Sequence, residues 1–155
     1  MSVGSANQRN FATRKGADKV VEDRIDKLGP MLSEIGGLAA DDAGGDPDGL
    51  YLYVEAGDRW ISSSLFKDEG DSVRYFDVSS ELSDLIYEFW RAEDRDKRWA
   101  VMEYETKGTK FDARFKYPEE VDVESFDEDR REIALKKRYG DKPIIYPPWP
   151  GQDVE

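Results

Sequence analysis

The chain has 155 residues, contains neither cysteine nor histidine, and carries a formal net charge of −12 at pH 7. This length allows one domain with one hydrophobic core, and an aromatic content of 12% is too high for a disordered chain. The missing residue types exclude disulfides, structural zinc and any Ser-His-Asp or Cys-His catalytic arrangement, so no cofactor and no metal are expected.

The first segments are predicted to be a lead-in, a helix and a loop. Residues 1–16 are polar and lack periodicity, which predicts a disordered lead-in. Apolar residues recur at helical spacing over 21–35, and we expect Pro30 to kink or split this helix and Gly36-Gly37 to end it. The acidic segment 41–49 reads as a turn-rich loop, because its spacing does not match that of a calcium-binding loop.

Three strands and a second helix are predicted next. The strands are expected over 50–56, 59–66 and 72–78, where alternating or short apolar runs are separated by polar turns. A serine, Ser79 or Ser80, is placed to cap the helix that follows. That helix carries the clearest apolar stripe in the chain, formed by Leu82, Leu85, Ile86, Phe89 and Trp90.

The last third of the chain predicts a hairpin, a helix and a tail. Two strands over 97–106 and 109–117 alternate apolar and charged residues, as in a sheet with one wet face. The capping box Ser125-x-x-Glu128 opens a short charged helix that ends near Tyr139. Four prolines in 141–155 predict an extended tail.

This order of elements predicts one α+β domain over residues 17–140. Strands joined by short turns form an antiparallel sheet of about five strands, and we expect the helices to pack on one face of it. The predicted order is α-β-β-β-α-β-β-α.

Several patterns in the sequence are candidates for a catalytic or binding site. Glu103 and Glu105 share one face of a strand, and we interpret them as surface charge. The run Ser62-Ser63-Ser64 has no histidine to activate it. Six aromatic residues are interpreted mainly as core: Tyr51, Tyr53, Trp60, Tyr75, Trp99 and Tyr104. The protein is therefore predicted not to be an enzyme; the enzymatic alternative would need a concave site whose carboxyl groups have raised pKa values.

The negative charge is concentrated in the middle third of the chain. Residues 41–96 contain 5 Lys and Arg against 16 Asp and Glu, whereas the segments on either side are nearly neutral. An acidic surface repels nucleic acid and anionic membranes, and it attracts basic partners. Solubility alone is the simpler explanation of the same pattern.

The order of elements and the placement of aromatic residues over 17–140 resemble the YezG-type immunity proteins of bacteria. These are small antitoxins encoded beside secreted polymorphic toxins. The segments that carry the resemblance are Tyr51-x-Tyr53-Val54-Glu55, Trp60 to Phe66, Phe89-Trp90, Trp99-x-x-x-Glu103-Tyr104, Phe111-x-x-x-Phe115-x-Tyr117, Phe126-Asp127-Glu128-Asp129-Arg130-Arg131 and Lys136-Lys137-Arg138-Tyr139-Gly140.

The resemblance implies a non-catalytic cytoplasmic protein that neutralises a cognate toxin, expected to be a basic nuclease domain. An acidic surface would replace the phosphates that such a nuclease normally meets. The residues expected to bind this partner are Asp68, Glu69, Asp71, Glu81, Asp84 and Glu88. The alternative is an acidic interaction or regulatory subunit with another protein partner, with self-association through the tail left open; neither nucleic acid nor membrane is expected as a partner.

Overall fold

A computed structural model describes residues 18–121 and 127–147, with side chains from Leu28 onward in the first helix and from Glu128 onward in the last. The predicted lead-in, the cap residue Ser125 and residues 148–155 of the tail lie outside the described residues. The described elements are α2 (Asp18–Asp42), β1 (Leu50–Gly57), β2 (Trp60–Asp68), β3 (Val73–Phe76), α3 (Ser80–Ala92), η1 (Arg95–Lys97), β4 (Val101–Lys107), β5 (Lys110–Lys116), η2 (Pro118–Glu120), α4 (Asp127–Tyr139) and β6 (Ile144–Ile145).

The strands form one six-stranded sheet in the order β5-β4-β1-β2-β3-β6. The four longer neighbouring pairs are antiparallel, and β6 adds a parallel edge strand of two residues beside β3. The α+β class and the predicted order of elements are confirmed. The sixth strand arises because the predicted extended tail pairs Ile144 and Ile145 with Val73 and Arg74.

Strand β1 lies at the centre of the sheet, and its alternation separates two kinds of residue. Leu52 and Val54 belong to the main apolar core, together with Leu50 and Ala56. Tyr51 and Tyr53 belong to a second, smaller cluster. The two sets point to opposite faces of the sheet, so β1 contributes aliphatic side chains to one face and tyrosines to the other.

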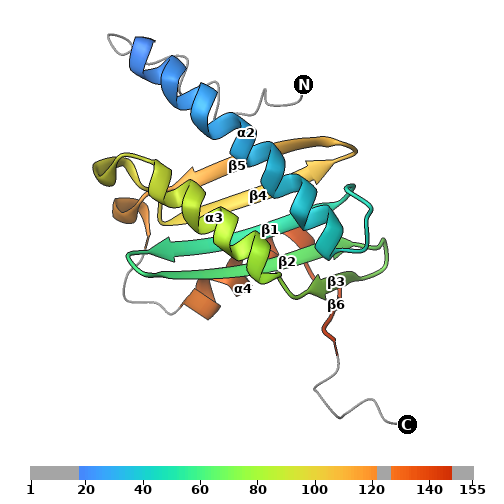
Figure 1. Ribbon diagram of the computed structural model, residues 1–155. Coiled ribbons are helices and arrows are strands. Elements are labelled where there is room, and N and C mark those ends of the chain that lie inside the picture. Colours follow the sequence, from blue (N-terminus) through green and yellow to red (C-terminus); the bar gives the residue numbers. More distant parts are fainter. Residues whose placement is uncertain (1–17, 122–126, 148–155) are drawn as a thin grey trace.

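Helices α2 and α3 lie side by side across one face of the sheet (Figure 1). They bury the main core with residues at helical spacing, which are Leu28, Leu32, Ile35 and Ala39 from α2 and Leu82, Ile86 and Phe89 from α3. Helix α4 lies behind the sheet, where Leu135 joins the cluster of Tyr51 and Phe66 (Figure 1). This differs from the expectation that the helices cover one face. The tyrosines and Val101 on the second face need a cover, and α4 provides it.

Helix α2 differs from its prediction at two points. It runs through Pro30 without a break and continues past Gly36-Gly37 to Asp42. Pro30 is exposed, and the apolar packing on either side of it outweighs the hydrogen bond that its missing N–H removes. The helix stops where Gly44 and Gly45 take positive φ angles of 98° and 107° and the Gly45 N–H donates to the carbonyl of Ala40.

One of the aromatic residues interpreted as core is exposed. Tyr51, Tyr53, Trp99 and Tyr104 are buried, and Tyr75 is half-buried, but 48% of Trp60 is exposed. Trp60 follows the β1–β2 turn, in which Arg59 has a φ of 70°. Its indole lies against Gly57, where a Cβ atom would collide with it. The indole can pack here at the tip of the hairpin only because Gly57 has no side chain.

Candidate interaction surface

Helix α3 presents three of the six residues predicted to bind a partner. Ser79 caps the helix, since its hydroxyl accepts a hydrogen bond of 3.1 Å from the Leu82 N–H. The buried stripe of the helix faces the sheet, so Glu81, Asp84 and Glu88 are exposed along the outer side. Their spacing of three and four residues aligns them in one row.

Helix α2 extends this negative surface. Its exposed side chains include Glu34 and Asp41, and the chain has no Lys or Arg between Leu28 and Asp58 or between Tyr75 and Trp90. The end of α2 is tied to the start of α3, because the Ser79 N–H donates to Oδ2 of Asp42 over 2.8 Å. We define the acidic face as the following exposed residues of the two helices: Glu34, Asp41, Glu81, Asp84 and Glu88.

The other three predicted residues lie in the turn between β2 and β3. Asp68 accepts hydrogen bonds from Nζ of Lys142 and the Gly70 N–H, each over 2.9 Å, and these bonds hold the pKa of its carboxyl group below the usual range. Glu69 forms an ion pair of 3.0 Å with Arg74. Asp71 is exposed. The six predicted residues therefore form two groups, one on α3 and one in a turn whose charge is partly neutralised.

The opposite face of the sheet holds a network of carboxylates beneath α4. The carboxylate of Glu55, whose side chain is 4% exposed, accepts two hydrogen bonds from Arg130 of α4, over 2.7 and 2.9 Å. The Tyr53 hydroxyl donates to the same carboxylate over 2.7 Å. Arg131 of α4 donates to the buried Ser64 hydroxyl over 3.2 Å. These bonds attach the first half of α4 to β1 and β2.

A second part of this network attaches the end of α4 to the sheet. Glu103 accepts a hydrogen bond of 2.8 Å from the Tyr51 hydroxyl. Glu105 forms ion pairs with Arg138 of α4 and, over 3.1 Å, with Arg114 of β5. Burial disfavours the ionised form of Glu105, but the two arginines outweigh it and keep the pKa of this carboxyl group below its usual value.

These contacts bear on the enzymatic alternative. Three carboxyl groups of the described residues, those of Asp46, Asp68 and Glu105, have pKa values below their usual range. A general acid near neutral pH needs a raised pKa instead. Burial raises the pKa values of Tyr51 and Tyr53, so both hydroxyls stay protonated as donors to the carboxylates. In the same residues, no group of three or more acidic side chains is arranged to hold a metal ion.

No helix among the described residues has the length and apolar character that crossing a membrane requires.

Sequence reasoning missed the pairing of Glu55 with Arg130 and of Glu105 with Arg138. The signal was present in part, because Glu55 shares its strand face with Tyr51 and Tyr53. The arginines of α4 could be placed only once it was known that this helix lies behind the sheet.

Comparison with known proteins does not identify a family for this chain. No protein-family model matches the sequence, and no curated protein is significantly similar to it. The resemblance to YezG-type immunity proteins therefore stays a prediction from the order of elements.

Proposed function

We propose that this protein is a non-catalytic cytoplasmic immunity protein that binds and neutralises a cognate bacterial toxin, a basic nuclease domain, through its acidic face. The observation that carries the proposal is the row of Glu81, Asp84 and Glu88 on α3, which continues onto α2 without a basic residue between. These carboxylates are exposed, whereas the acids beneath α4 are tied to arginines.

The electrostatics of such a complex favour fast association. A nuclease domain is positive around its substrate groove, because the groove must hold phosphates. A row of carboxylates on a rigid helix supplies negative charge at fixed positions and steers the encounter. The helix needs no rearrangement to bind, since its inner side is anchored in the core by Leu82, Ile86 and Phe89.

A second candidate function is an acidic interaction or regulatory subunit that self-associates. The observation that favours it lies at the edge of the sheet. Ile145 of β6 and Tyr146, the residue after this strand, are both exposed. Tyr146 packs on Tyr75 with ring centroids 5.2 Å apart, which leaves an apolar strip along this edge. A concentration-dependent dimer that Tyr146→Ser disrupts would support this function.

The proposal predicts that a toxin domain is encoded beside this gene, and this domain is the partner used in the test. Co-expression should restore the viability of cells that produce the toxin, and the two proteins should form a complex that weakens as salt rises. The variant Glu81→Gln/Asp84→Asn/Glu88→Gln should weaken binding by at least about tenfold, since each charge contributes up to about 1 kcal/mol.

The matched control neutralises the turn between β2 and β3. The variant Asp68→Asn/Glu69→Gln/Asp71→Asn removes the same number of charges, two of which already have a basic partner. It should weaken toxin binding by less than about threefold. An equal loss in both variants would show that net charge alone is responsible, and unchanged binding in the first would exclude the acidic face.

A further inference from the structure

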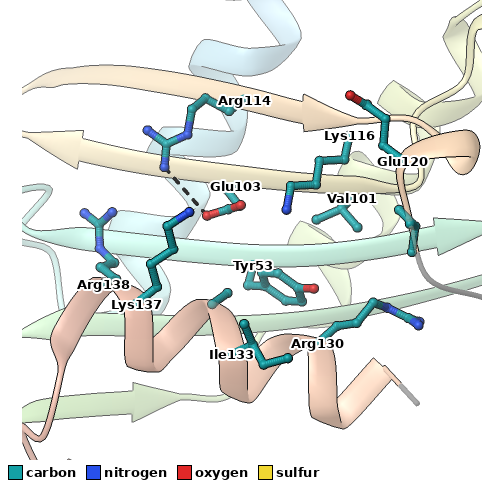
Figure 2. A pocket seen from close by; sticks show the side chains of 12 residues that line it. Tyr53, Val101, Glu103, Arg114, Lys116, Glu120, Arg130, Ile133, Lys137 and Arg138 are labelled. Atoms are coloured by element: carbon teal, nitrogen blue, oxygen red, sulfur yellow. Dashed lines mark ion pairs between the residues drawn. The ribbon is translucent and has the colours of Figure 1, made fainter. Parts of the chain in front are cut away.

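A cleft lies on the face of the sheet opposite the acidic face, between α4 and strands β4 and β5 (Figure 2). Its volume is about 620 Å³, which falls within the range of roughly 300 to 1,000 Å³ typical of sites for small molecules. The proposed toxin-binding function does not use it.

The cleft exists because α4 covers only part of this face. Its buried residue Leu135 packs with Tyr51 and Phe66, on β1 and β2. Toward β4 and β5 the helix presents Ala134, the exposed Ile133 and long charged side chains instead. The ion pairs of Arg130 and Arg138 fix the helix in this position, so the cleft is built into the fold.

Part of the cleft lining is apolar. Val101 of β4 and Tyr53 of β1 belong to its floor, and Val121 follows η2 at one end. Ile133 of α4 also lines the cleft, although 68% of it is exposed. Exposing this isoleucine to water costs free energy that a bound apolar group would recover.

Among the charged residues of the lining, the arginines are paired with carboxylates, whereas two lysines are not. Arg130 and Arg138 are paired with Glu55 and Glu105. Arg114 lies within 3.1 to 3.7 Å of three carboxylates on β4 and β5. Within the described part of the chain, the side-chain ammonium groups of Lys116 and Lys137 form no hydrogen bond or ion pair.

The two lysines belong to opposite walls of the cleft. Lys116 of β5 is paired with Val101 of β4, and the next row pairs Glu103 with Arg114. Lys137 comes from α4 on the other wall, and Figure 2 shows both lysine side chains directed toward the middle of the cleft. The lining contains two acids, Glu103 and Glu120. Glu103 is bound to Tyr51 and Arg114, and Glu120 accepts a hydrogen bond of 2.8 Å from the Tyr117 N–H.

We propose that this cleft binds a small organic anion, in which a carboxylate, sulfonate or phosphate group is attached to an apolar portion. Lys116 and Lys137 hold the anionic group from opposite walls, and Ile133 and Val121 contact the apolar portion. The cleft thereby concentrates positive charge at one place in a protein whose net charge is −12.

The test uses the isolated full-length protein and the fluorescent anion 1-anilinonaphthalene-8-sulfonate, which combines a sulfonate with apolar rings. The protein should bind it at one saturable site under native conditions. The variant Lys116→Gln/Lys137→Gln should lower the affinity by about tenfold, and Ile133→Ser should lower it by about threefold. The control is Lys136→Gln, because Lys136 is adjacent on α4 but does not line the cleft and lies 3.8 Å from Asp141; it should change the affinity by less than twofold.

Competition identifies which part of the ligand the cleft recognises. Octanoate should displace the dye at concentrations at which inorganic phosphate does not. Displacement by both to the same extent would overturn the apolar half of the proposal. Dye binding that persists in the double lysine variant, or that is absent from the native protein, would overturn the site itself. Circular dichroism of each variant shows whether a loss of binding comes from unfolding. No toxin is present, so the outcome is independent of the proposed immunity function.

Discussion

On one face of the sheet, α2 and α3 cover Leu52 and Val54 with leucine, isoleucine and phenylalanine side chains. On the other face, α4 covers Tyr53 and Glu55 with arginine side chains. The first contact is non-directional and depends on the apolar area buried. The second depends on the alignment of individual charged groups, and it leaves an open cleft beside the helix.

This difference decides where the negative charge of the molecule is available. Acids on the α4 face are used inside the fold, since Glu55 and Glu105 are bound to arginines. Acids on the outer side of α2 and α3 are not needed for packing, because their helices are held from below by apolar residues. The face that is stabilised without charge is therefore the one that can offer charge to a partner.

The largest difference between the faces should appear when matched isoleucines are truncated. Ile86 of α3 is fully buried in the main core, whereas 68% of Ile133 of α4 is exposed. We expect Ile86→Ala to lower the free energy of unfolding by about 3 kcal/mol, and Ile133→Ala to change it by less than about 0.5 kcal/mol. Urea denaturation measures both. Similar losses would mean that α4 also depends on apolar packing.

The next effect concerns the buried ion pair beneath α4. Arg130→Met should lower the free energy of unfolding by about 2 kcal/mol, because it leaves the carboxylate of Glu55 buried without its cation. The double variant Glu55→Gln/Arg130→Met should recover at least half of this loss, since the amide still accepts a hydrogen bond from Tyr53. A double variant as unstable as the single one would show that the lost packing of Arg130 matters more than its charge.

The tightness of packing on the α2 face is tested by two adjacent glycines. A Cβ atom at Gly36 would lie 2.5 Å from the Tyr104 hydroxyl oxygen, and this hydroxyl donates to the Leu32 carbonyl over 2.7 Å. Gly36→Ala should therefore destabilise the fold by about 1.5 kcal/mol. A Cβ at Gly37 meets nothing within 4 Å, so Gly37→Ala should stabilise the protein by about 0.5 to 1 kcal/mol. Thermal unfolding distinguishes the two, and equal effects would show that α2 does not approach β4 this closely.

The ionic character of the α4 face should also make it sensitive to acid. The pKa of Glu105 in the folded protein lies below its ordinary value of 4.5. Its ionised form therefore stabilises the fold above about pH 4.5, and this contribution is lost as the pH falls through the lower folded pKa. Arg138→Met should cost about 1 kcal/mol at pH 7, with partial exposure limiting the effect.

The difference between Arg138→Met and the unsubstituted protein should then shrink toward pH 3. Urea denaturation at several pH values measures this convergence. A difference that does not depend on pH would assign the cost to the stacking of Arg138 on Tyr51, whose ring centroid lies 4.5 Å from the guanidinium carbon.

The smallest effect on stability is expected on the acidic face. Glu81→Gln/Asp84→Asn/Glu88→Gln should change the free energy of unfolding by less than about 0.5 kcal/mol, because these side chains are exposed and lie outside the core. Glu81 lies in the first turn of α3, so its neutralisation removes a small favourable interaction with the helix dipole. A loss above about 1 kcal/mol in denaturation would show that these acids serve the fold.

Much of the fold could be predicted because the patterns that define it are local. The stripe of α3 and the alternation of β5 both identified elements that the structure contains. The glycines and proline of α2 were misleading, because their local cost is exceeded by contacts with β4 and the core. The row of acids on α3 was also predictable, since the side of a helix opposite its apolar stripe must face water.

The class of the fold, the order of its main elements and the concentration of acid in the middle third could all be predicted from the chain alone. These follow from short-range periodicity and from counting charges. Three features depend on how the elements pack: α4 lies behind the sheet, Glu55 and Glu105 pair with its arginines, and Lys116 and Lys137 line opposite walls of a cleft. The physical reason is that these contacts join residues from different elements, whose distance depends on how helices and strands pack and not on their spacing along the chain.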